Sequence, residues 1–256
     1  MNRLHIARCA AIIILLITIA ACGTSPWHQE QADARLNIGT AYLGEDRFND
    51  ALKEFSQAED FAPNDPKVHY YMGITYYKKG LNDKAIGEFK RALSIKSDYS
   101  EAHNFLGVIY LEMGFWDNAI ESFKNALSNT IYETPDKSIF NMGRAYQGKG
   151  DYQKALSAYQ EAKTTKPNSI PLPLIDHQIG LTFYAQGNID KAVQYFQTSL
   201  KMAPSIDSHY WLGQCYIKLR DFEKAKAEFK SIIEITPESS WGIAAKKSLD
   251  SLGTSR

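Results

Sequence analysis

The chain of 256 residues carries 29 Lys and Arg side chains against 29 Asp and Glu, so its formal net charge is zero. A protein without a basic excess lacks the charge that binds a phosphate backbone, which excludes the strongly basic class of nucleic-acid-binding protein. Three cysteines provide no disulfide framework for a chain of this length, so its stability must come from packed apolar side chains.

The first 21 residues have the pattern of a secretory signal peptide. Arg3 and Arg8 make the start basic, and an uninterrupted apolar run follows at residues 10–19. A run of about ten residues is too short to cross a bilayer as a helix but has the length of a signal-peptide core. Removal of residues 1–21 leaves 27 basic and 29 acidic side chains, a net charge of −2.

The residues that end this segment predict a lipid anchor. Ile-Ala-Ala-Cys, ending at Cys22, resembles the bacterial lipobox, in which the cysteine is acylated and becomes the first mature residue. Three acyl chains, at about 0.8 kcal/mol per buried methylene, hold a protein on a membrane without a transmembrane helix. Resemblance to enterobacterial lipoprotein sorting implies, from Gly23 at the second mature position, the outer membrane and a domain that faces the periplasm. The alternative is an ordinary cleaved signal with a coincidental cysteine.

Residues 22–31 contain Gly, Ser, Pro and Gln without an apolar period, and we expect them to form a tether. A pattern then occurs six times: a glycine, an aromatic side chain three residues later, an alanine at twelve and a second aromatic at sixteen. The glycines are spaced by 34, 34, 36, 37 and 33 residues, at Gly39, Gly73, Gly107, Gly143, Gly180 and Gly213. The alanines are Ala51, Ala85, Ala119, Ala155, Ala192 and Ala225, and the second aromatics are Phe55, Phe89, Phe123, Tyr159, Phe196 and Phe229.

This pattern resembles the tetratricopeptide repeat, a helix–turn–helix unit that stacks into a superhelical solenoid. We therefore predict an all-α fold with six repeats over residues 32–239, at 32–65, 66–99, 100–133, 136–169, 173–205 and 206–239. The glycine and alanine positions are small because two helices cross there. Prolines end the second helix of four repeats, at Pro63, Pro167, Pro204 and Pro237. Residues 240–256 are predicted to form a capping helix and tail, with Trp241, Ala245, Leu249 and Leu252 on one apolar face.

The inner groove of such a solenoid is lined by the first helix of each repeat. The groove positions of the first three repeats are mostly apolar or aromatic, where a solvated face would be polar: Leu36, Thr40, Leu43, Tyr70, Ile74, Tyr77, Asn104, Val108 and Leu111. We predict that a partner's helix or extended peptide binds there, with all but Thr40 as site residues. The alternative is that tight curvature lets these side chains pack on one another. In the fourth repeat the same positions are Phe140, Arg144 and Gln147, so the stripe becomes polar after its first residue.

The sequence shows no pattern typical of catalysis or metal binding. His69, His103 and His209 occupy the same position of three different repeats, so they are too far apart to share a metal ion. Cys215 replaces small or apolar residues of the other repeats and is predicted to be a buried core thiol. We predict a protein that is not an enzyme, with no metal, no small-molecule substrate and no cofactor beyond the covalent lipid on Cys22.

A lipobox, a short tether, six repeats and a C-terminal helix together resemble the type IV pilus biogenesis lipoproteins known as pilotins. The segment from Ala126 to Gly143, with Tyr132, Pro135 and Phe140, is similar to that family's extended junction after the third repeat. The resemblance implies a role in the localisation and assembly of the secretin, the outer-membrane pore of the pilus. It also implies a binding surface in the N-terminal repeats and a secretin subunit as the partner.

Two other functions remain open on the sequence alone. One is an envelope adaptor that scaffolds peptidoglycan hydrolases, and the other is a component of outer-membrane protein assembly or polysaccharide export machinery. Each would use the same solenoid surface for a different protein.

Overall fold

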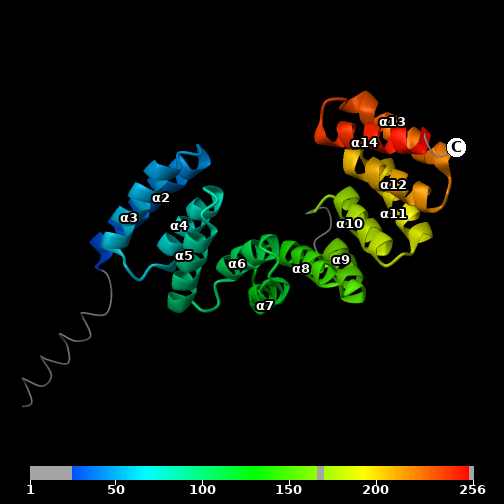
Figure 1. The fold of residues 1–256 in the computed structure, drawn as a ribbon. Coiled ribbons are helices and arrows are strands. Elements are labelled where there is room, and N and C mark those ends of the chain that lie inside the picture. Colours follow the sequence, from blue (N-terminus) through cyan, green and yellow to red (C-terminus); the bar gives the residue numbers. More distant parts are fainter. Residues whose placement is uncertain (1–24, 166–169, 254–256) are drawn as a thin grey trace, which may run out of the picture. The chain divides into compact units, whose positions relative to one another are not determined.

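A computed structural model describes residues 25–165 and 170–253. This part of the chain contains thirteen α-helices and no strand, which confirms the all-α prediction (Figure 1). The predicted signal peptide and the predicted lipidation site Cys22 lie outside the described residues. The chain divides into two compact units, residues 1–105 (unit 1) and 106–256 (unit 2), each of which is described by itself.

The helices form hairpins that follow the predicted repeats. Their bounds are α2 Pro26–Gly44, α3 Phe48–Phe61, α4 Pro66–Lys78, α5 Asn82–Ile95, α6 Ser100–Glu112, α7 Trp116–Leu127, α8 Pro135–Lys149, α9 Tyr152–Thr165, α10 Leu172–Ala185, α11 Ile189–Met202, α12 Ile206–Lys218, α13 Phe222–Ile235 and α14 Ser240–Gly253. Consecutive helices from α2 to α13 pair as the six repeats, and α14 is the predicted additional helix. The boundary between the units falls inside α6.

The predicted tether at 22–31 is wrong for residues 26–31, which are helical. Ser25 is the N-cap of α2, and its hydroxyl accepts a hydrogen bond from the backbone N–H of His28 at 3.3 Å. Pro26 occupies the first turn, where the missing N–H has no intrahelical acceptor and the fixed φ suits a helix. The first helix therefore begins six residues before the start of the predicted first repeat.

Local chemistry explains where the other helices end. Gly80, Gly114, Gly150 and Gly187 have positive φ angles between 73° and 84° and end the first helix of their hairpins. Glycine takes this left-handed conformation without the steric cost of a Cβ. Helices α3, α11 and α13 each end two residues before a proline, at Phe61, Met202 and Ile235, because proline cannot continue the backbone hydrogen bonding.

The two helices of each hairpin cross at the predicted glycine. A methyl group at Gly73 would lie 2.8 Å from the ring of Phe89, and one at Gly180 would lie 2.8 Å from the ring of Phe196. Each of these rings is fully buried against its glycine. The alanines of the second helix, such as Ala85 and Ala192, are also fully buried. The repeat pattern therefore encodes the closest approach of the two helices.

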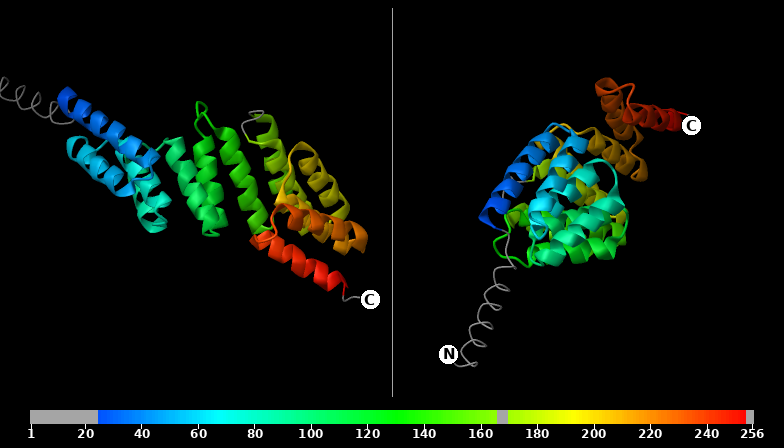
Figure 2. Two further views of the ribbon diagram at one scale, coloured as in Figure 1. Left: turned by 90° about the horizontal axis from the view of Figure 1, so that it is seen from above. Right: turned by 90° about the vertical axis from the view of Figure 1, so that its left-hand side faces the viewer.

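Helix α14 covers the last hairpin of unit 2, as predicted. It packs on α13, and the two lie side by side in Figure 2. Ala245 is buried in the same cluster as Phe229, and Trp241, Leu249 and Leu252 pack against that cluster. Within residues 25–165 and 170–253 no helix combines the length and apolar character needed to cross a membrane.

Candidate protein-binding site

The predicted groove residues are divided between the two units. Six of them lie in unit 1, namely Leu36, Leu43, Tyr70, Ile74, Tyr77 and Asn104, whereas Val108 and Leu111 lie in unit 2. Within unit 1 some are buried and others half-exposed, so the structure does not support one uniform apolar stripe.

Leu36 and Leu43 are not exposed groove residues, and the prediction is wrong for both. Their side chains are only 5% and 8% exposed, and they belong to a core cluster that includes Phe55. These leucines of α2 pack against α3 and α4, which bury almost all of their surface. Only a small part of the Leu36 side chain contributes to a surface pocket of about 340 Å³, and the other residues that line this pocket, from α2 and α4, are mostly polar.

The aromatic positions of α4 form a half-buried cluster with Tyr99, just before α6, and Phe105 of α6. The ring centroid of Tyr70 lies 5.0 Å from Tyr99 and 5.8 Å from Phe105, and Tyr77 lies 6.2 Å from Phe105. These contacts agree with the alternative that groove side chains pack on one another. Tyr70 and Tyr77 are still half-exposed, and so are Ile74 and Asn104. We call Tyr70, Ile74, Tyr77 and Phe105 the aromatic surface of unit 1.

In unit 2 the predicted site residues are largely part of the core. Leu111 is 5% exposed in a cluster with Phe123 and Ala145, and Val108 packs against that cluster. The prediction is therefore wrong for Leu111 as an open groove residue, because the start of the fourth repeat covers it. An exposed edge of Leu111 nevertheless reaches a cleft between repeats.

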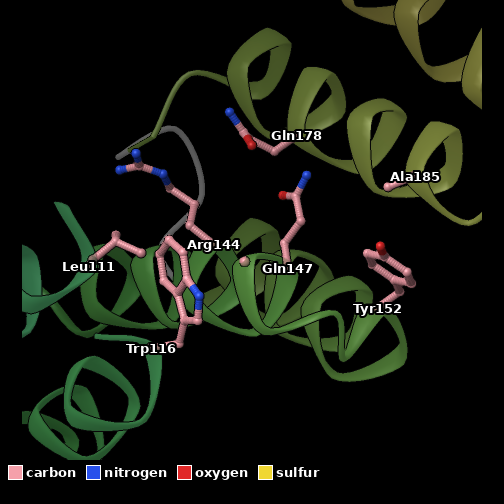
Figure 3. Close-up of a pocket in the computed structure, with 8 residues that line it drawn as sticks. Leu111, Trp116, Arg144, Gln147, Tyr152, Gln178 and Ala185 are labelled. Carbon is pink, nitrogen blue, oxygen red and sulfur yellow. The ribbon is translucent and has the colours of Figure 1, made fainter. Parts of the chain in front are cut away.

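This cleft of unit 2 has a volume of about 350 Å³ and collects side chains from five helices, α6 to α10 (Figure 3). Its lining residues are Leu111, Trp116, Arg144, Gln147, Gly148, Tyr152, Gln178 and Ala185. We refer to it as the Trp116 cleft. Arg144 and Gln147 rise from α8, and Gln178 faces them from α10.

Two contacts fix the geometry of the Trp116 cleft. A methyl group at Gly148 would lie 2.9 Å from the indole of Trp116, so the ring rests directly on the α8 backbone at this glycine. The hydroxyl of Tyr159 donates a hydrogen bond to Gln147 Oε1 at 2.8 Å. Burial raises the pKa of Tyr159 well above its usual value, so the phenol keeps its proton and remains a donor.

The sequence predicted no site here, although it marked Arg144 and Gln147 as a polar interruption of the stripe. The cleft joins residues as far apart as Leu111 and Ala185, so no local pattern reveals it. One available signal was Gly148, a glycine inside a helical segment that lies opposite a large aromatic residue.

Two of the histidines singled out in the sequence make hydrogen-bonded contacts with a glutamate of the second helix of their hairpin. His69 Nδ1 lies 2.9 Å from Glu88 Oε2, and His209 Nδ1 lies 2.6 Å from Glu228 Oε2. Arg35 and Glu54 form the corresponding pair of the first repeat at 2.9 Å. These pairs connect the first helix of a repeat to the second. Among the described residues no group of three or more His, Cys, Asp or Glu side chains is arranged to hold a metal ion.

The remaining polar and thiol groups of interest are buried. His177 Nδ1 lies 2.8 Å from Ser208 Oγ, and Ser208 in turn contacts Ser199 Oγ at 3.2 Å. Burial lowers the pKa of His177 and favours its neutral form. Cys215 is a fully buried free thiol, as predicted, and burial raises its pKa to about 12. A thiol with this pKa forms almost no thiolate near neutral pH and is a poor nucleophile.

Helical hairpins that pack one on the next define a class of helical repeat scaffold. Models of the tetratricopeptide repeat match residues 39–80, 76–114, 98–167 and 177–240. The chain thus belongs to the tetratricopeptide repeat family, whose members generally bind other proteins and are not enzymes.

Solved structures with the same fold match almost from end to end. PilF of Pseudomonas aeruginosa is 16% identical with a TM-score of 0.71, and the match covers 86% of this chain and 99% of that one. PilW, described as a widely conserved type IV pilus biogenesis factor, is 19% identical with a TM-score of 0.74, over 83% of this chain and 97% of that one. The human intraflagellar transport protein 88 homolog is 30% identical over 112 residues, which are 43% of this chain but only 14% of that protein.

Proposed function

We propose that this chain is a lipid-anchored scaffold of the outer membrane that helps a secretin subunit to localise and assemble, as a pilotin. The observation that carries the proposal is the near end-to-end match to PilF and PilW, the second of which is a type IV pilus biogenesis factor. A short repeat segment occurs in many proteins, whereas these two chains correspond to ours over almost their entire lengths.

The lipid on Cys22 would hold unit 1 close to the membrane. Only three residues separate Cys22 from Pro26, where α2 begins. A fully extended chain covers about 3.5 Å per residue, so this connection reaches roughly 14 Å at most. Unit 1 is then positioned near the membrane-embedded pore that its partner forms.

The aromatic surface of unit 1 is the proposed contact for the secretin. Tyr70 and Tyr77 present amphipathic rings that are already ordered by Tyr99 and Phe105. Aromatic side chains held in this way lose little conformational entropy when a partner binds, and they are enriched at protein interfaces. A partner helix or extended peptide would bury their exposed parts.

The experiment is affinity capture of the tagged, lipidated protein from detergent-solubilised envelopes, followed by identification of the bound proteins. We expect the secretin subunit to be enriched with the wild type and lost with Tyr77→Asp. Tyr184→Asp is the matched control, because Tyr184 takes the equivalent place in unit 2, with its ring 5.1 Å from Trp211.

Enrichment of a peptidoglycan hydrolase, or of outer-membrane assembly or export components, in place of the secretin would contradict the pilotin proposal and select the corresponding alternative. Equal loss of the secretin from both tyrosine variants would contradict the assignment of the contact to unit 1. Separately, Cys22→Ser should leave a folded protein outside the membrane fraction, and unchanged membrane fractionation would contradict the lipid anchor.

A further inference from the structure

The Trp116 cleft lies in unit 2, outside the surface proposed for the secretin, and its chemistry is different. We infer that it is a second peptide-binding site, which takes an internal Asp or Glu side chain of a partner protein together with a neighbouring apolar side chain. The inference goes beyond the pilotin proposal and does not depend on it.

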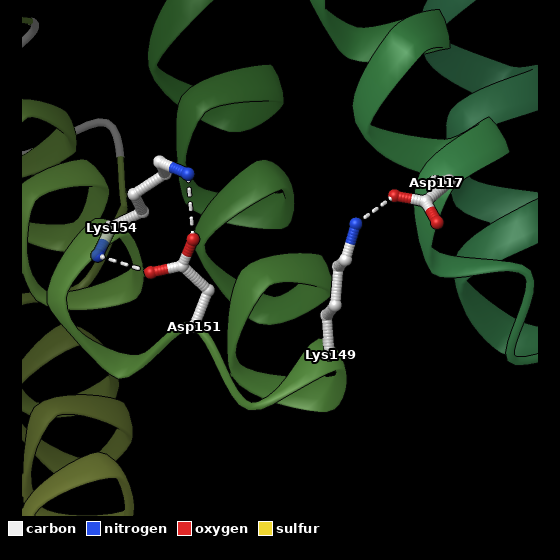
Figure 4. A network of polar contacts seen from close by, with 4 residues as sticks. All are labelled: Asp117, Lys149, Asp151 and Lys154. Atoms are coloured by element: carbon white, nitrogen blue, oxygen red, sulfur yellow. Dashed lines mark hydrogen bonds and ion pairs between the residues drawn. The ribbon is translucent and has the colours of Figure 1, made fainter.

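The charge of the cleft is the first reason to expect an acidic ligand. Arg144 is the one charged residue among its eight lining residues, and none of them is acidic. Among the described residues, the side-chain partner of its guanidinium is the neutral Oδ1 of Asn141, at 3.4 Å, and no carboxylate lies within ion-pair distance. Lys149 and Lys154, on the same hairpin, each have an aspartate partner (Figure 4). The cleft therefore contains a cation whose countercharge the described chain does not supply.

The neutral polar groups favour the same kind of ligand. The hydroxyl of Tyr159 donates to Gln147 Oε1 and so fixes the orientation of the Gln147 amide. The NH₂ group of Gln147 then remains available as a hydrogen-bond donor. Gln178 brings a second amide toward Arg144 from the opposite helix (Figure 3). A carboxylate has two oxygens that can accept two N–H groups of a guanidinium and a further hydrogen bond from an amide, and such charge-assisted bonds are strong.

Apolar groups beside Arg144 define the second part of the ligand. The indole of Trp116 is held against the backbone at Gly148, and the exposed edge of Leu111 lies in the same wall. Trp and Arg are among the residue types most enriched at the positions that dominate binding energy. A volume of about 350 Å³ has room for a few side chains of a peptide and not for a whole helix. We therefore expect an extended segment.

The test is selection of peptides from a phage-displayed random nonapeptide library on the immobilised protein. The displayed peptides are fused at their C-termini, so a selected carboxylate belongs to an internal side chain. Wild-type protein should enrich Asp or Glu at a constant distance from an aromatic or aliphatic residue. Arg144→Gln should bind the selected peptides at least about tenfold more weakly, because the ligand carboxylate loses its charge-assisted hydrogen bonds to the guanidinium.

A charge reversal and a control make the result specific. Arg144→Glu should enrich Lys or Arg at the position where the wild type selects an acid. Lys230→Gln removes an exposed cation of α13, outside the cleft, and should leave selection unchanged. Circular dichroism and thermal unfolding should match for all variants, because Arg144 is exposed. Selection without acidic enrichment, or selected peptides that bind Arg144→Gln as tightly as the wild type, would overturn the inference.

Discussion

The ion pair between Lys163 and Asp176 offers a quantitative test of how the fourth and fifth repeats are joined. Lys163 Nζ of α9 lies 3.0 Å from Asp176 Oδ1 of α10, and the lysine is 30% exposed while the aspartate is 1% exposed. The second oxygen, Asp176 Oδ2, is buried and has no hydrogen-bond partner in the described structure. Lys163 is therefore the countercharge on which this buried carboxylate depends.

We predict that Lys163→Ala lowers the free energy of unfolding by about 2–3 kcal/mol. Removal of one partner from a fully buried pair costs roughly 3–5 kcal/mol, because the other charge remains without water or a counterion. Lys163 is partly exposed, so water that enters its place compensates for some of this loss. Asp176→Ala added to Lys163→Ala removes the uncompensated charge and should restore part of the stability.

Urea unfolding followed by circular dichroism measures this effect as a shift of the midpoint. Lys154→Ala is the matched control, since its pair with Asp151 at 2.7 Å is screened by solvent and should contribute much less to the free energy of unfolding. The reasoning is refuted if Lys163→Ala and Lys154→Ala have the same midpoint, or if the double variant is no more stable than Lys163→Ala alone.

Three further changes test other parts of the fold. Ala85→Leu should cost about 1–3 kcal/mol in urea unfolding because it overpacks a fully buried helix crossing, and a neutral result would show that the crossing is elsewhere. Burial lowers the pKa of His177 in the folded state, so the unfolded chain takes up the proton first as pH falls below roughly 6.5. As the pH falls below roughly 6.5, His177 thus contributes a loss of stability, which His177→Gln should reduce; equal pH profiles would contradict this. Tyr70→Asp should lower the melting temperature more than Tyr77→Asp, since Tyr70 packs within unit 1 against the rings of Tyr71, Phe89, Tyr99 and Phe105 and so links three helical segments; the reverse order would contradict the packing.

The sequence alone predicted the repeats because their period reflects a local constraint. Each hairpin has a glycine in its first helix and an aromatic residue sixteen positions later, as in Gly73 and Phe89. The position must be glycine because the ring of the second helix packs directly against its backbone. The capping helix was predictable for a similar reason, from an apolar face with the spacing of a helix. The start of α2 was missed because its polar first turn has no apolar period, although Ser25 and Pro26 form a helix start signal.

The binding surface was harder to predict because exposure depends on neighbouring helices. Leu36 and Tyr70 occupy the same repeat position, yet Leu36 is buried by the adjacent helices and Tyr70 remains half-exposed. In the sequence, both residues belong to the same stripe of apolar and aromatic positions, so the pattern does not distinguish the buried one from the exposed one. The Trp116 cleft depends on tertiary contacts even more strongly, because Trp116, Arg144 and Gln178 come from three different repeats.

The central claim is tested most directly by deletion of the gene, followed by detection of the SDS-resistant secretin multimer in the outer membrane. We predict that the multimer is replaced by monomer, and that the wild-type gene restores it whereas Cys22→Ser does not. A multimer that forms normally in the deletion strain would contradict the proposed role in secretin assembly.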